Sequence, residues 1–474
     1  MLRARVTIFF LIAFCPLTVN VKAMTDFPAD SVSGSKKIVI GNISLAGNRV
    51  TRSKIILREL TFSENDCLSI GQLNEKFELS RENLLKTSLF NYVYIDTVTD
   101  SDNRLGVNVR LEERWYTWPE IYLNHADRNF TSWWQTKDFG RLYYGLGVTR
   151  YNFRGRQEKI SARMITGFTS LLSFAYHNIY LDEQRRHSID LEAFFENQNR
   201  LDYSTENNEI QQFKSDNRIY RKTSYYFTYN YRHRLYASHQ LLLMYYNYNI
   251  SDTVLSLNSN YLGELRKKLE FSGLSYIFEY DRRDLKYYPL KGRYFNCQFS
   301  YFGLFNKGIN KFEVKTGYFH FFELFPRYYA SMGLKTQIEN KKDQPYVLTE
   351  ALGYKDFLRG FDNYVIDGHN FLLFKSTLKY EVLPTKIINL KFLPFSQFNK
   401  VHLAAYISLF FDAGYVHDYY NNNVNHNNTL VDQGLITFGA GIDLVTYYDK
   451  MLRFDLAHNK LDGWGFYLNL NQNF

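Results

Sequence analysis

From about residue 114 to the C-terminus, apolar and polar side chains alternate with a period of two residues. In the segment "HSIDLEAFFE", Ile189 and Leu191 share one parity, whereas Asp190 and Glu192 share the other. Successive side chains of a β-strand point to opposite faces, so this period predicts strands with one apolar and one polar face. About sixteen such segments follow one another, each close to the ~10 residues that a tilted membrane-spanning strand requires.

The composition indicates what the apolar face contacts. The chain of 474 residues has 40 Tyr and 40 Phe, yet its mean hydropathy is -0.37. No internal apolar run approaches the ~20 residues of a spanning helix, which excludes a helical membrane protein. Abundant aromatic residues in a chain of polar average favour a transmembrane antiparallel β-barrel with aromatic rims, closed because lipid does not tolerate an open sheet edge. A soluble all-β protein is the alternative.

The N-terminus carries an export signal. Arg3 and Arg5 precede an apolar stretch at residues 6–17, and Val21-x-Ala23 resembles a signal-peptidase site. Residues 1–23 are therefore predicted to be a signal peptide, followed by a polar linker at 24–35. The formal charge of +9 comes from Lys and Arg scattered among acidic residues. For an exported chain this favours acidic lipid headgroups rather than nucleic acid as the neighbour.

A small module is predicted at residues 36–113, with the order β-α-α-β-β. The segment "KIVIGNISLAGNRV" predicts a strand that ends at the turn pair Gly47-Asn48. Thr51 is placed to cap a helix that runs through Leu60, and a second helical pattern extends over about 71–90. The segments "YVYIDTV" and "RLGVNVRLEE" alternate as two strands of a hairpin.

This module resembles a POTRA domain of the BamA/TamA/Sam-like superfamily of outer-membrane protein assembly factors. The element order and the Gly-Asn-x-x-Thr turn in "ISLAGNRVTRSKIILREL" carry the resemblance. It implies a periplasmic domain whose sheet edges pair with an extended client strand, a mode that any exposed edge permits. A ferredoxin-like or other small α+β domain is the alternative.

Four segments of the predicted barrel, which spans residues 114–474, extend the resemblance over nearly the whole mature chain. They resemble the early hairpin, the Asp-x-Arg-Asp…Pro-x-x-Gly motif, the Leu-Arg-Gly-Phe hallmark of a loop that folds into the lumen at about 339–370, and the Phe-x-Asp-x-Gly strand. The residues that carry these matches are Asn152, Phe153 and Gly155; Asp281, Arg283, Asp284, Pro289 and Gly292; Leu358, Arg359, Gly360 and Phe361; and Phe410, Asp412 and Gly414.

The chemistry of the loop follows from its residue types. Arg359 is always charged, and its planar fork can hold a carboxylate by two parallel bonds, so a narrow lumen must offer it an acidic wall. Strand parity turns both Asp412 and Glu381 inward as candidate partners, although Glu381 departs by one position from the acidic residue common in the family. Gly360 permits a tight tip, and Phe361 is expected to pack against the wall. A solvated surface-loop charge is the alternative for Arg359.

The resemblance implies insertion or translocation of other polypeptides at the bacterial outer membrane, without covalent chemistry, cofactor or metal. Pro119 lies in the expected first strand and cannot donate a ladder hydrogen bond. We therefore expect a weak seam with the last strand, where Phe474 resembles the terminal assembly signal of outer-membrane barrels. Expected partners are outer-membrane lipids and unfolded or nascent client proteins, and accessory periplasmic or lipoprotein subunits stay an open alternative.

Other functional classes fit the residues less well. A single POTRA domain is compatible with an accessory role and equally with secretion of one dedicated partner. A passive outer-membrane pore would share the barrel pattern but would not need the POTRA domain or the lumen loop. A hydrolase is disfavoured because the sequence has no Gly-x-Ser-x-Gly, His-Glu-x-x-His or phosphate loop. His402 and Asp412 share strand parity, but ten residues of strand separate them by ~30 Å.

Overall fold

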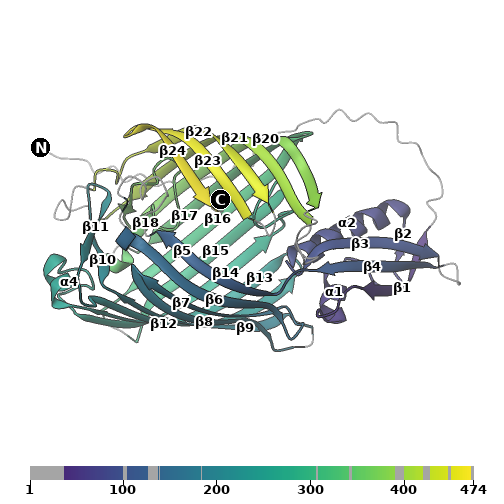
Figure 1. Ribbon diagram of the computed structural model, residues 1–474, viewed down its shortest axis with the longest axis horizontal. Helices are drawn as coiled ribbons and strands as arrows, with labels where there is room; N and C mark the ends of the chain where they lie inside the picture. The colour runs from purple at the N-terminus through teal and green to yellow at the C-terminus, as the bar shows by residue number, and fades with distance from the viewer. Residues whose placement is uncertain are drawn as a thin grey trace, which may run out of the picture.

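The structure is a computed structural model in which an N-terminal domain adjoins one end of a large barrel (Figure 1). The residues that it describes are 37–99, 104–125, 137, 139–182, 184–305, 308–340, 344–389, 400–419, 428–446 and 450–470. The predicted signal peptide at 1–23, the linker at 24–35, the hairpin turn at 100–103 and Phe474 lie outside these residues.

The N-terminal domain packs two helices on a four-stranded sheet. Its elements are β1 (Ile38–Ala46), α1 (Ser53–Glu59), β2 (Cys67–Leu68), α2 (Ile70–Lys86), β3 (Phe90–Thr99) and β4 (Leu105–Glu113). The sheet order is β2-β1-β4-β3, with β1 and β4 parallel. Ile40, Ile55, Leu84 and Phe90 are fully buried between the layers, so apolar burial holds the helices against the sheet.

The helix starts differ from the sequence prediction. Thr51 does not cap α1, whose N-cap is Arg52 without a side-chain cap bond. The Thr51 hydroxyl instead lies 3.0 Å from the Tyr116 hydroxyl and accepts a hydrogen bond from Asn152. The second helix begins at a capping box formed by Ser69 and Gln72 and ends at Lys86. The two-residue strand β2 was not predicted, because two residues are too few to show an alternation.

The barrel is a 16-stranded sheet in which all consecutive neighbours are antiparallel, as predicted. Its strands are β5 (Thr117–His125), β6 (Leu142–Phe153), β7 (Glu158–Gly167), β8 (Thr169–Tyr180), β9 (His187–Gln198), β12 (Tyr220–Arg234), β13 (Ala237–Ile250), β14 (Lys268–Asp281), β15 (Gly292–Leu304), β16 (Lys311–Phe325), β17 (Tyr328–Glu339), β20 (Asn370–Asn389), β21 (Lys400–His417), β22 (Leu435–Thr446), β23 (Lys450–Asn459) and β24 (Gly463–Leu470). A short helical turn, η1 (Phe139–Arg141), precedes β6.

The two faces of this sheet divide as the alternation requires. Phe227 and Leu241 are exposed on the outer face, whereas Ser224 and Thr228 on the same strands are buried inside. Inside the barrel, Ser275 donates a hydrogen bond of 2.8 Å to Ser300 on the neighbouring strand. An apolar outer belt around a polar interior is the arrangement of a lipid-embedded barrel.

Among the described residues, no helix is both long and apolar enough to cross a membrane.

The two ends of the sheet order are β5 and β24, and the described residues contain no ladder pair between them. Pro119 lies in β5 opposite Val148 of β6. Ile121 on β5 is 83% exposed, against 45% for Leu241 within the sheet. Pro119, which has no N–H to donate, therefore lies on a strand at one end of the described sheet order.

Several short elements cover the end of the barrel away from the N-terminal domain (Figure 1). They are the hairpin β10 (Arg200–Glu206) and β11 (Glu209–Lys214), α4 (Asp252–Leu257), η2 (Tyr346–Leu348), and the pair β18 (Glu350–Leu352) and β19 (Ile366–Asp367). Asn208, at the tip of the β10–β11 hairpin, accepts a backbone bond from Val365 and side-chain bonds from Thr429. Segments far apart in sequence are thus tied together across this end.

Candidate functional site: the lumen loop

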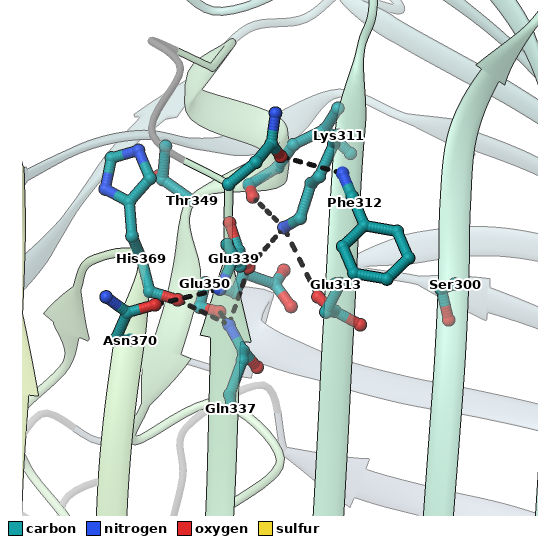
Figure 2. Close-up of polar contacts among 12 residues, drawn as sticks. Ser300, Lys311, Phe312, Glu313, Gln337, Glu339, Thr349, Glu350, His369 and Asn370 are labelled. Carbon is teal, nitrogen blue, oxygen red and sulfur yellow. Dashed lines mark hydrogen bonds and ion pairs between the residues drawn. The ribbon is translucent and has the colours of Figure 1, made fainter. Parts of the chain in front are cut away.

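The lumen loop, residues 340–370, leaves β17 and returns into β20. Figure 2 shows how its two ends are fastened to the wall. Lys311 at the start of β16 donates to the Leu348 carbonyl oxygen over 2.7 Å and lies 2.7 Å from the Glu339 carboxylate. Gln337 donates to the same carboxylate, and the Glu339 backbone N–H donates to Asn370 over 2.8 Å. These bonds hold both ends of the loop against the barrel wall.

Arg359 at the inner end of the loop forms an ion pair with Asp412 on β21. Its Nε donates to Asp412 Oδ2 over 2.7 Å, and its Nη2 donates to Asp412 Oδ1. Its Nη1 donates to the Thr377 hydroxyl over 3.1 Å and its Nη2 to the Ser376 carbonyl over 3.0 Å. The guanidinium lies 4.2 Å from the centre of the Phe410 ring. Arg359 is 6% exposed and Asp412 is fully buried, so the pair is desolvated and the geometry is bidentate.

The neighbours of Arg359 fit the wall closely. Leu358 and Phe361 are buried in one apolar cluster with Leu352 and Val416. A Cβ atom on Gly414 would lie 3.2 Å from Leu358, so glycine at this position on β21 leaves room for the loop. Gly360 has φ +83°, and a Cβ there would lie 2.9 Å from the Ala457 side chain. The tip therefore requires glycine for both its backbone angle and its contacts.

The tip also contacts the last two strands of the barrel, which the sequence did not predict. The Gly360 carbonyl oxygen accepts hydrogen bonds from Asn459 Nδ2 on β23 over 2.5 Å and from the Tyr467 hydroxyl on β24 over 3.0 Å. Tyr467 is buried beside Phe410 and Ala457. One loop thus joins β20 and β21 on one side to the terminal strand on the other.

Replacement of Tyr467 by phenylalanine is expected to loosen this contact. The change removes one hydrogen bond to a buried carbonyl, worth about 1 kcal/mol, and Asn459 still donates to the same oxygen. Hydrogen exchange of the amides at residues 358–361 should therefore become several-fold faster. The matched control is Tyr415→Phe, because the Tyr415 hydroxyl donates to Asp432 on an exposed surface. Equal exchange in both variants would contradict a role of Tyr467 in holding the tip.

The Asp-x-Arg-Asp segment begins at the last residue of β14 and opens the connection to β15, residues 282–291. Arg283 donates twice to Asp281, over 2.9 and 2.8 Å, and its guanidinium lies 4.2 Å from the Tyr294 ring centre. Asp284 accepts the Leu290 N–H beside Pro289 over 3.1 Å. Gly292 has φ +107°, and a Cβ there would lie 2.0 Å from the Arg282 carbonyl oxygen. The motif is therefore a self-bonded turn.

Comparison with protein-family models places the chain among known proteins. A model of the Omp85 superfamily domain matches residues 152–474, and a POTRA model described as surface antigen variable number repeat matches residues 38–114. The chain belongs to the Omp85 superfamily. This membership agrees with the resemblance found in the sequence, and it establishes the N-terminal unit as a POTRA domain.

Two solved structures are similar to this Omp85 chain, and the first of them shares its fold. BamA from Haemophilus ducreyi lacking POTRA domains 1–3 is 16% identical, with a TM-score of 0.51 over 91% of this chain and 84% of that one. CdiB from Escherichia coli is 10% identical, with a TM-score of 0.47 over 93% of this chain and 91% of that one. A search of the curated proteins gave no significant match.

The structure corrects one predicted partner in this Omp85 barrel. Glu381 does not contact Arg359 within the described residues; it accepts a hydrogen bond from the Tyr406 hydroxyl over 3.4 Å. In the β20–β21 ladder Asp412 lies opposite Lys375, whereas Glu381 lies opposite Tyr406. Six residues of strand place the two carboxylates ~20 Å apart along the barrel. Strand parity correctly predicted that Glu381 faces inward, but it did not predict the position of Glu381 along the barrel axis.

A second buried ion pair supports the wall on the side of β22 and β23. Arg453 Nε donates to Asp443 Oδ1 over 2.9 Å, and the hydroxyl of Tyr288 donates to Asp443 Oδ2 over 2.7 Å. Tyr288 belongs to the Asp-x-Arg-Asp turn, so this bond ties the turn to the opposite wall. The sequence carried a signal for the pair, because Asp443 and Arg453 are oppositely charged residues at inward parity in consecutive strands.

Several contacts join the POTRA domain to the barrel among the described residues, and three of them are as follows. Asn152 and Gly155 of the early hairpin meet the segment before α1, with the Arg52 N–H donating to Gly155 O over 3.0 Å. The Tyr92 hydroxyl lies 2.9 Å from His402 Nε2 on β21. The third contact pairs Glu59 of α1 with Arg232 of β12 over 2.9 Å. These contacts fix the domain against the strand ends.

The described residues contain no group of three or more His, Cys, Asp or Glu side chains placed to hold a metal ion. His402 is separated from Asp412 along β21 and contacts the POTRA domain instead.

Proposed function

We propose that this Omp85 chain inserts or translocates client polypeptides at the bacterial outer membrane, with the POTRA domain in the periplasm and without a covalent step. The observation that carries the proposal is that β5 and β24 end the sheet order, with no ladder pair between them among the described residues, in a barrel whose lumen loop is bonded to β24. An unpaired edge offers backbone donors and acceptors that a client strand can occupy.

The contacts across the barrel favour this function over a passive pore. The lumen loop runs to the wall at Asp412, and Asn208, Val365 and Thr429 tie segments together across the end away from the POTRA domain. An open channel would need a continuous wet path instead. Deletion of residues 344–368 is expected to raise single-channel conductance, whereas a native pore would already conduct fully.

The seam is tested by cross-linking. Cysteine pairs scanned between residues 117–123 of β5 and residues 463–470 of β24 should, once oxidised, block client insertion, and a reductant should restore it. The matched control is Leu456→Cys with Phe466→Cys, since these residues already lie opposite one another in the β23–β24 ladder. Full activity of a cross-linked β5–β24 barrel would refute the seam as the route.

A separate experiment distinguishes insertion of many client proteins from secretion of a single one. Depletion of the protein followed by proteomics of the outer membrane should show broad loss of barrel proteins if insertion is general. Loss of one exported protein would instead identify a dedicated secretion channel. Outer-membrane lipids and unfolded or nascent chains are the partners that both outcomes require. Accessory periplasmic or lipoprotein subunits would be found by co-purification with the tagged chain.

A further inference from the structure

A charged cavity lies where the POTRA helices meet the strand ends of β8, β9 and β12–β14. Its volume is about 340 Å³. Six Lys or Arg side chains line it, against three Asp or Glu side chains. Two of these carboxylates are already engaged, because Glu59 pairs with Arg58 and Arg232, and Asp281 holds Arg283. The cavity therefore has an excess of positive charge.

Arg185, in the turn between β8 and β9, is the least compensated of these cations. It is 6% exposed, and its Nη1 atom has no hydrogen-bond partner among the described residues. Its guanidinium lies 5.6 Å from the centre of the Tyr180 ring, and no ion pair to a described carboxylate accompanies it. Burial, with Arg58 nearby, lowers the pKa of Arg185.

Arg58 of α1 approaches the same aromatic ring from the POTRA domain. Its guanidinium lies 5.8 Å from the Tyr180 ring centre, and its Nη2 donates to Gln157 over 2.8 Å. Its Nη1 is buried and makes no hydrogen bond within the described part of the chain. Two guanidinium groups from different domains thus each keep a buried, unused N–H group beside one ring.

A buried arginine without a counter-ion is costly, and arginine does not escape the cost by losing its proton. Donors that converge from two domains suit an anion whose oxygens diverge. A phosphate group presents such oxygens and binds guanidinium forks by parallel hydrogen bonds. The cavity volume accommodates one phosphate group with room for water.

We propose that the cavity binds a phosphate group between Arg58 of the POTRA domain and Arg185 of the barrel, and that the bound anion fixes how the two domains dock. Free phosphate and the headgroup of a phospholipid share this chemistry. The proposal does not depend on the client of the barrel, so its failure would leave the seam experiment unaffected.

The test uses the full chain in nanodiscs of digalactosyldiacylglycerol, a bilayer lipid that carries no phosphate group. Inorganic phosphate is titrated at constant ionic strength, with chloride as the balancing anion, and thermal unfolding is recorded. A second arm replaces free phosphate by nanodiscs that contain phosphatidylglycerol. We expect a saturable rise of Tm in one arm, and Arg185→Gln should weaken the apparent affinity roughly tenfold to a hundredfold. Arg110→Gln, a change at an exposed pair with Asp96, should respond like the native chain.

Without ligand, Arg185→Gln is expected to change Tm in the opposite direction. In galactolipid nanodiscs without added phosphate the variant should unfold at a higher temperature than the native chain, because it removes an uncompensated buried charge. If that variant does not fold, Arg58→Gln tests the same site from the POTRA side. The proposal is overturned if chloride alone produces the same shift, if Arg185→Gln responds like the native chain, or if only an acidic peptide raises Tm.

Discussion

Replacement of Arg359 by alanine is expected to destabilise the barrel by about 3–5 kcal/mol, because Asp412 would stay buried without its counter-charge. The loss should be larger than for a truncated side chain alone, since Thr377 and the Ser376 carbonyl also lose their donor. Denaturant unfolding of the chain reconstituted in lipid vesicles measures the change. Hydrogen exchange of the buried POTRA amides should stay at the native level, because that domain has its own core.

A double-mutant cycle separates the pair from its surroundings. Arg359→Ala combined with Asp412→Ala should cost less than the sum of the single changes, because the double variant leaves no unpaired charge. The matched control is Arg81→Ala in α2, where an exposed pair with Glu78 should change stability by less than about 1 kcal/mol. Native stability of Arg359→Ala would show that the ion pair does not support the barrel.

Glu59→Gln is expected to release the POTRA domain from the barrel. The Glu59 side chain is 3% exposed and accepts hydrogen bonds from Arg58 and Arg232. Without its charge these two arginines repel one another. We expect a cost on the order of 3 kcal/mol, reduced by the partial exposure of Arg232, which is 32%. A distance between spin labels on α2 and β13 would report the separation, and Glu64→Gln, on the exposed side of the domain, is the control.

The same contact predicts how docking depends on pH. Burial raises the pKa of Glu59, but Arg232 and Arg58 outweigh it and hold the pKa below the ordinary value of 4.5. A lowered pKa means that the stabilisation is complete above pH 4.5 and is lost as the pH falls through the lowered value. Docking should therefore be constant at neutral pH and release only in acid. In Glu59→Gln this acid transition should disappear; an unchanged transition would assign it to another group.

Much of the fold was predictable because it follows from local periodicity. Alternation predicted the strands and their inward faces, and sixteen of them form the sheet. The prediction that Thr51 caps α1 was wrong, because the Thr51 hydroxyl is hydrogen-bonded to Tyr116 and Asn152 instead. A residue that fits a local rule can thus be used elsewhere when a distant donor is better placed.

The loop was predictable in part. Its position and the inward parity of Asp412 followed from the sequence, but the choice between Asp412 and Glu381 required the height of the tip. The height of the tip depends on contacts at the ends of the loop, such as the ion pair between Lys311 and Glu339. These two residues are 28 positions apart in sequence and lie on the neighbouring strands β16 and β17. Asn459 and Tyr467 were missed for the same reason, because only the curvature of the whole sheet brings β23 and β24 to Gly360.

The position of these contacts along the chain gives the last strand a further role. Every wall residue that Arg359 and Gly360 bind lies later in the sequence than the tip itself, and the most distal is Tyr467. In a product truncated before Tyr467, the buried Gly360 carbonyl oxygen would lack one of its hydrogen-bond donors, which would destabilise the tip. Such a product would open more often and be degraded sooner, because proteases cleave the opened state. The contacts of the loop would thus form in full only after synthesis has passed Tyr467.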